Sequence, residues 1–71
     1  MSWDNSYVNF GLVTIEGQNR LKIYRNRDNY IYLTVGNESV KDVRWTGNTL
    51  TVYLNNGKVR RYSDQNNYIT I

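Results

Sequence analysis

The chain has 71 residues, 39% of them hydrophobic, contains no cysteine or histidine, and carries a formal net charge of +3. A chain this short predicts one domain, residues 1–71, whose core is thin because it buries only about 60% of its unfolded surface. The lack of cysteine and histidine excludes disulfides, the usual zinc sites, and catalysis by a serine or cysteine paired with histidine. The modestly basic balance is compatible with a polyanionic partner.

Strand-like runs recur about every ten residues, which is the spacing of an all-β barrel or sandwich. The first predicted strand covers residues 7–15, and its apolar positions change parity at Gly11, which indicates a bulge or a sharp bend there. Two further strands are predicted over residues 21–24 and 30–35. Alternation directs Leu21, Ile23, Ile31, Leu33 and Val35 inward and leaves Tyr30 and Tyr32 outward.

Residues 40–63 predict a three-stranded meander with reversals at Gly47-Asn48 and Asn56-Gly57. The first turn places Trp45 opposite Leu50. The second turn, expected to be of type I′, places Leu54 opposite Val59 and Tyr53 opposite Arg60. The predicted core face then consists of Val43, Trp45, Leu50, Val52, Leu54 and Val59. The predicted outward face consists of Asp42, Arg44, Thr51, Tyr53, Arg60 and Tyr62.

Arg61 does not fit this register, because it falls on the apolar face beside Val52. Either Arg61 lies at an open rim, or a bulge at Arg60-Arg61 turns Tyr62 inward; of the two, we favour the bulge. A last short apolar strand is predicted over residues 68–71. The predicted fold is therefore all-β, a small meander barrel of six to seven short antiparallel strands, SH3-like or OB-like in scale.

The remaining charged and glycine residues predict no catalytic or metal site. The six carboxylates are scattered singly, and no Asp-x-Asp-x-Asp loop suggests calcium. No glycine-rich phosphate loop is present either. We therefore expect a protein that is not an enzyme and needs no metal or cofactor. The N-terminus has no signal-peptide pattern and no stretch is long enough to cross a bilayer, so the expected location is the cytoplasm, without a membrane partner.

Basic and aromatic side chains alternate along the outward positions of the predicted strands. Single-stranded nucleic acid is bound by such surfaces, because bases stack on rings while Lys and Arg neutralise phosphates. The opposing interpretation is that outward tyrosines and cross-strand Arg–Tyr pairs stabilise the sheet without any ligand. The predicted nucleic-acid-binding residues are Arg20, Lys22, Tyr24, Tyr30, Tyr32, Arg44, Tyr53, Lys58, Arg60 and Tyr62.

The meander also resembles a known family over about residues 39–62. Ser39-Val40, Val43, Leu50-Thr-Val52, Leu54, Asn56-Gly57, Val59 and Tyr62 are similar to the strand pattern of the KTSC-type small bacterial domain. That family occurs behind lysyl-tRNA synthetase and is thought to bind RNA, so the resemblance implies RNA as the nucleic acid. After Tyr62 the family continues with a Val-Pro element and a helix, whereas this chain continues with Ser63-Asp-Gln-Asn-Asn. The resemblance therefore implies no site residue in this chain.

Two other functions fit the same pattern. The tyrosine- and arginine-rich face is also typical of a protein-interaction or inhibitor module of the mobile-element or phage type. Alternatively, the chain is a structural subunit that forms a homo-oligomer through exposed strand edges. The predicted partner is thus single-stranded nucleic acid, a protein, or a second copy of this chain.

Overall fold

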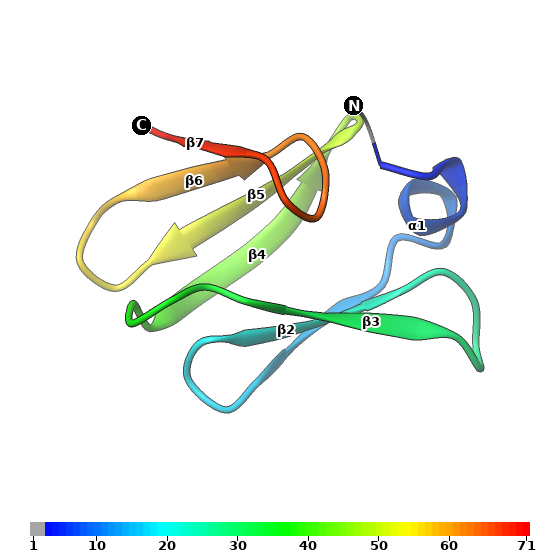
Figure 1. The fold of residues 1–71 in the computed structure, drawn as a ribbon, viewed down its shortest axis with the longest axis horizontal. Coiled ribbons are helices and arrows are strands. Elements are labelled where there is room, and N and C mark those ends of the chain that lie inside the picture. Colours follow the sequence, from blue (N-terminus) through cyan, green and yellow to red (C-terminus); the bar gives the residue numbers. More distant parts are fainter. Residues whose placement is uncertain (1–2) are drawn as a thin grey trace.

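The computed structural model describes residues 3–71, which form seven strands and one short helix; residues 1–2 of the predicted domain lie outside the described residues. The elements are α1 (Asn5–Phe10), β1 (Val13–Glu16), β2 (Arg20–Tyr24), β3 (Tyr30–Thr34), β4 (Val40–Thr46), β5 (Thr49–Leu54), β6 (Val59–Tyr62) and β7 (Tyr68–Thr70). Strands β1–β3 form one antiparallel sheet, sheet A, and strands β4–β7 form a second, sheet B (Figure 1).

The predicted all-β character is confirmed, but the predicted closed barrel is not, because the described strands form two separate sheets. The chain leaves sheet A after β3 by running along the turn between β1 and β2. There, the Val35 N–H donates to the Asn19 carbonyl and the Val40 N–H donates to the Gln18 carbonyl, both at 2.7 Å. This connection starts β4 beside β1 of the other sheet, and each sheet then continues as its own meander.

The prediction of a single strand over residues 7–15 is wrong in its first half, which is helix α1. The Asp4 carboxylate caps the helix by accepting the Ser6 N–H at 2.8 Å. Gly11 ends it in the left-handed conformation, at a φ of 70°, and its N–H donates to the Tyr7 carbonyl. Gly11 is therefore a helix cap and not a strand bulge, because a residue just past a helix end favours positive φ.

The first turn of the predicted meander is confirmed. Trp45 pairs with Leu50 and Val43 pairs with Val52, as the Gly47-Asn48 reversal requires. Gly47 has a φ of 61° and no residue other than glycine has a positive φ among the described residues. The positive φ is thus confined to the first central residue, as in a type II′ hairpin turn.

The register predicted for the second turn is wrong by one residue. Tyr53 pairs with Val59, where we had expected Arg60, and Leu54 does not pair with Val59. The loop has three residues, Asn55 to Gly57, since the Leu54 N–H donates to the Lys58 carbonyl and only Gly57 has a positive φ. A type I′ turn needs positive φ at both central residues, whereas a three-residue loop needs it only at the last.

This shift exchanges the two faces of β6, because side chains alternate along a strand. Tyr62 is buried opposite Leu50, and Arg60 lies on the inner face opposite Val52. Val59 and Arg61 point to the outer face instead, opposite Tyr53 and Thr51. The inward position predicted for Tyr62 by the favoured alternative is therefore confirmed. Its cause is the three-residue loop and not the bulge predicted at Arg60-Arg61.

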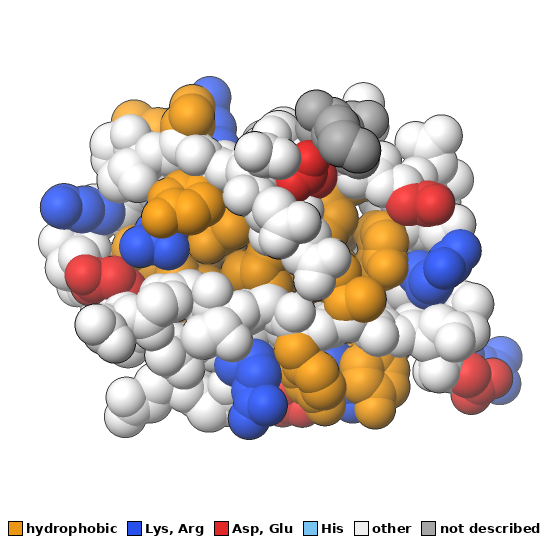
Figure 2. All heavy atoms as spheres, in the orientation of Figure 1, with side chains coloured by type: hydrophobic (Ala, Val, Ile, Leu, Met, Phe, Trp, Pro, Cys, Tyr) orange, Lys and Arg blue, Asp and Glu red, His pale blue; other side chains and the backbone are white. Residues whose placement is uncertain are grey.

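The core lies between the inner faces of the two sheets. Its buried members are Trp3, Leu21, Ile23, Leu33, Val35, Val40, Leu50, Val52, Leu54 and Tyr62. The inward positions predicted for Leu21, Ile23, Leu33 and Val35 are confirmed, whereas Ile31 is only half-buried. In Figure 2, hydrophobic side chains are visible in the middle of the view, between the strands of sheet B above and those of sheet A below.

We expect acid to destabilise the fold through Asp4 and Asp64. Hydrogen bonds from Ser6 to Asp4, and from Asn66 and Asn67 to Asp64, lower the pKa of each carboxyl below its ordinary value of 3.8. A lowered folded-state pKa contributes stability above the unfolded-state value, and that contribution disappears as the pH falls through the folded-state pKa. Urea unfolding at about pH 6 and about pH 2.5 measures the loss.

The matched control for this prediction is the double variant Asp4→Asn/Asp64→Asn, which keeps an amide oxygen at both positions but has no charge to titrate. Its free energy of unfolding should depend less on pH than that of the native chain over the same range. An equally steep acid loss in the double variant would assign the effect to other carboxylates.

Candidate nucleic-acid interface

Five of the ten predicted binding residues share the outer face of sheet A. The register pairs Lys22 with Tyr32 and Tyr24 with Tyr30, so these side chains project from the same side of β2 and β3. Phe10, at the end of α1, adds a ring beside Tyr24. We call this set the basic-aromatic face; its residues are Phe10, Arg20, Lys22, Tyr24, Tyr30 and Tyr32.

The rings of the basic-aromatic face form a continuous series. Ring centroids are 6.4 Å apart for Phe10 and Tyr24, 5.5 Å for Tyr24 and Tyr30, and 5.5 Å for Tyr30 and Tyr32. Phe10, Tyr30 and Tyr32 each keep about 45% of their surface exposed. Exposed rings in series supply stacking surfaces for several planar groups at once.

Two cations lie over these rings. Lys22 Nζ is 4.0 Å from the Tyr30 ring centroid and 5.2 Å from that of Tyr24, and Arg20 Cζ is 5.0 Å from that of Tyr32. Hydrogen bonding to Tyr24 raises the pKa of Lys22 above its ordinary value of 10.5, with a further contribution from the phenols of Tyr24, Tyr30 and Tyr32. Lys22 is therefore positively charged at neutral pH. Figure 2 shows basic and hydrophobic side chains next to one another along its lower edge, below β2 and β3.

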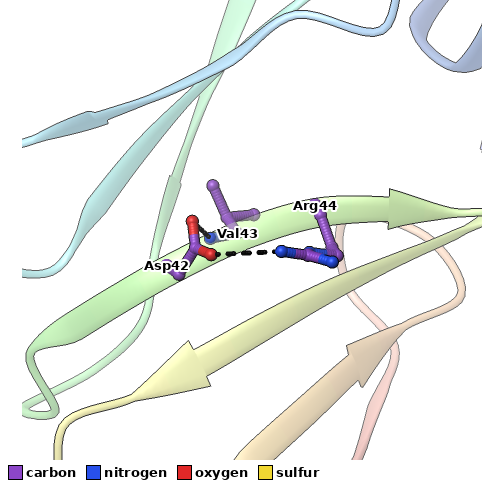
Figure 3. Close-up of polar contacts among 3 residues, drawn as sticks. All are labelled: Asp42, Val43 and Arg44. Atoms are coloured by element: carbon purple, nitrogen blue, oxygen red, sulfur yellow. Dashed lines mark hydrogen bonds and ion pairs between the residues drawn. The ribbon is translucent and has the colours of Figure 1, made fainter.

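Arg44 and Tyr53 lie on the outer face of sheet B and are separate from the basic-aromatic face. Arg44 Cζ is 5.8 Å from the Tyr53 ring centroid. An Arg44 nitrogen is also 3.7 Å from an Asp42 oxygen, and the other Asp42 oxygen accepts the Val43 N–H (Figure 3). Asp42 offsets the charge of Arg44, so this pair is less suited to a phosphate than Arg20 and Lys22 are.

The other three predicted residues do not join either outer face. Tyr62 was expected outside but is buried, with 3% of its surface exposed. Arg60 was also expected outside, but its side chain lies on the inner face of β6 beside Tyr68. Lys58 is exposed at the end of the β5–β6 loop. The ten residues thus do not form one surface, because they are divided between two sheets and a loop, and the register of β6 places two of them on the inner face.

Two relevant residues were missing from the predicted set. Phe10 was expected on a strand, and only the helix caps at Asp4 and Gly11 could have placed its ring next to Tyr24. Tyr68 lies under the Arg60 guanidinium, with 4.5 Å between Cζ and the ring centroid. Tyr68 pairs with Tyr62 and therefore lies on the same, inner side of sheet B, so the correct β6 register would have predicted the position of Tyr68.

The described part of the chain holds no group of three or more Asp and Glu residues that could hold a metal ion. Nor does any helix in residues 3–71 reach the length and apolarity that a membrane span requires. Comparisons of the chain with protein-family models, with curated proteins and with solved structures found no match. The resemblance to the KTSC-type domain therefore stays a prediction.

Proposed function

We propose that this chain is a non-enzymatic binding module that contacts single-stranded nucleic acid through the basic-aromatic face of sheet A. The observation that carries the proposal is the series of four exposed or half-exposed rings with Lys22 and Arg20 directly over them. Each base that stacks on a ring contributes about 1–3 kcal/mol, and the two cations neutralise neighbouring phosphates. The similarity of residues 39–62 to an RNA-associated family favours RNA over DNA.

The surface suits unpaired bases better than a duplex. Its rings stand on a strand surface, where the planar faces of splayed bases can reach them. In a duplex the base faces are already stacked on one another, which leaves mainly backbone contacts. We therefore expect labelled single-stranded RNA to bind more tightly than the matching duplex.

The first test is a fluorescence anisotropy titration of labelled single-stranded RNA and DNA at several salt concentrations. With two phosphate contacts, the slope of log affinity against log salt should be about −1.4, since each contact to a single strand contributes about −0.7. Affinity should then fall about sevenfold between about 50 and 200 mM salt. Affinity that is independent of salt, or equal on duplex, would contradict the proposal.

Two lysine variants distinguish binding through the basic-aromatic face from attraction by net charge in this titration. Lys22→Gln removes a charge from the basic-aromatic face and should reduce the slope by about 0.7. Lys58→Gln removes an equal charge from the exposed β5–β6 loop and should leave the slope unchanged. Equal effects of both variants would show that net charge alone attracts the nucleic acid.

Assembly through strand edges is a second candidate, favoured by one observation. Strand β7 is an edge of sheet B, and Ile69 and Ile71 at this edge each have 63% of their surface exposed. Exposed apolar edges pair with other chains. Sedimentation velocity over a range of protein concentrations tests this, and a constant monomer would exclude it. If the RNA titration shows no binding, the basic-aromatic face is better explained as a protein-interaction surface.

A further inference from the structure

A second candidate site lies between the two sheets. A cleft of about 400 Å³ separates the region around β3 from β6 and β7. Such a volume lies in the range of small-molecule sites. Tyr32 and Thr34 line it from sheet A, while Arg60, Tyr62, Asn66 and Tyr68 line it from sheet B and the β6–β7 turn.

Arg60 is the only charged side chain among the described residues that line this cleft. The β6 register places it opposite the fully buried Val52, so its stem is held on the inner face of sheet B. The guanidinium stacks over the Tyr68 ring, at 4.5 Å from Cζ to the ring centroid. These contacts orient the guanidinium at the cleft wall.

Most hydrogen-bond donors of this guanidinium have no acceptor among residues 3–71. An arginine has five N–H donors, and one Arg60 Nη donates to the Tyr62 hydroxyl at 3.3 Å. Nε is buried and has no hydrogen-bond partner in the described part of the chain. No carboxylate of residues 3–71 forms an ion pair with Arg60, because the one ion pair there joins Arg44 to Asp42. Within residues 3–71, the charge of Arg60 therefore has no carboxylate partner, and most of its N–H donors have no acceptor.

We propose that the cleft binds a small ligand that joins an oxyanion to a planar ring, with the oxyanion on Arg60. A guanidinium presents a planar fork of donors that matches the oxygens of a carboxylate or a phosphate. The rings of Tyr68 and Tyr32 lie along the same cleft and offer apolar surface to the planar part of the ligand. This site shares Tyr32 with the basic-aromatic face, but its oxyanion contact is Arg60 of sheet B, and it does not require the basic-aromatic face to bind nucleic acid.

Nuclear magnetic resonance of ¹⁵N-labelled protein tests the proposal, because the side-chain Nε–H of arginine gives its own signal. The probes are inorganic phosphate, a nucleoside monophosphate, the matching nucleoside, and benzoate. The monophosphate or benzoate should shift the Arg60 Nε–H signal saturably, and the nucleoside should not. A response to the monophosphate alone would identify the oxyanion as a phosphate, and a response to benzoate alone would identify it as a carboxylate. A response to both would mean that Arg60 binds either oxyanion.

The variant Arg60→Lys keeps the charge but removes the planar fork, and we expect it to weaken binding of the responding probe at least about tenfold. Its matched control is Arg61→Lys, because Arg61 is the next residue of β6 and points to the outer face. Arg61→Lys should bind the probe as the native chain does. Tyr30→Ala, on the basic-aromatic face, should also leave probe binding unchanged.

Three results would overturn the proposal. No Arg60 shift at millimolar probe, an equal shift of the Arg61 signal, or unchanged affinity in Arg60→Lys would each exclude Arg60 as the oxyanion site. The native-chain titration keeps the proposal testable if Arg60→Lys fails to fold. If the native chain does not bind RNA but its Arg60 Nε–H signal still responds to the probes, only the function proposed for sheet A is contradicted.

Discussion

Replacing Trp3 with alanine is expected to lower the free energy of unfolding by about 3–5 kcal/mol, the usual cost of removing a buried aromatic side chain. Trp3 is 5% exposed and contacts the Trp45 ring edge-on, with centroids 5.4 Å apart. Its indole N–H donates to the Tyr62 carbonyl at 2.9 Å. Trp3 thereby joins the segment before α1 to two strands of sheet B.

A loss of this size is comparable with the whole stability of a domain of about 70 residues. Urea unfolding followed by circular dichroism should therefore show Trp3→Ala partly or fully unfolded without denaturant. Phe10→Ala is the matched control, since Phe10 is 45% exposed and the variant should lose about 1 kcal/mol or less. Equal losses in the two variants would mean that Trp3 does not anchor the fold.

Removing the Tyr30 and Tyr32 rings together is expected to weaken binding of single-stranded RNA by about 2–6 kcal/mol. Each ring is 44% exposed, and each base stacked on a ring contributes about 1–3 kcal/mol. The double variant Tyr30→Ala/Tyr32→Ala should keep its fold, because neither ring belongs to the buried core. Fluorescence anisotropy at low salt measures the change in affinity.

Tyr53→Ala is the control for this double variant. Tyr53 also faces outward beside an arginine, but from sheet B, where Asp42 offsets the charge of Arg44. We expect RNA affinity in Tyr53→Ala to stay within about twofold of the native chain. If Tyr53→Ala weakens binding as much as the double variant does, the interface is not the basic-aromatic face of sheet A.

Sequence patterns predicted the structure correctly where interactions between residues close in the sequence decide it. Alternation in residues 21–24 and 30–35 correctly placed Leu21 and Ile23 inside, and it brought four of the predicted binding residues to one face. The caps of α1, Asp4 and Gly11, were also local signals. Gly11 was interpreted as a bulge or bend in a strand because the apolar residues before it fit a strand as well as a helix of only six residues.

The sequence by itself determined that this chain is mostly β, where most of its strands begin and end, and which side chains of β2 and β3 share a face. The tertiary structure decided the number of sheets, the loop that sets the β6 register, and the resulting inward positions of Arg60 and Tyr62. Asn56-Gly57 is compatible with either a two- or a three-residue loop, and these differ by one residue in register. Burial of Tyr62 opposite Leu50 favours the three-residue loop, and the local sequence does not contain that packing energy.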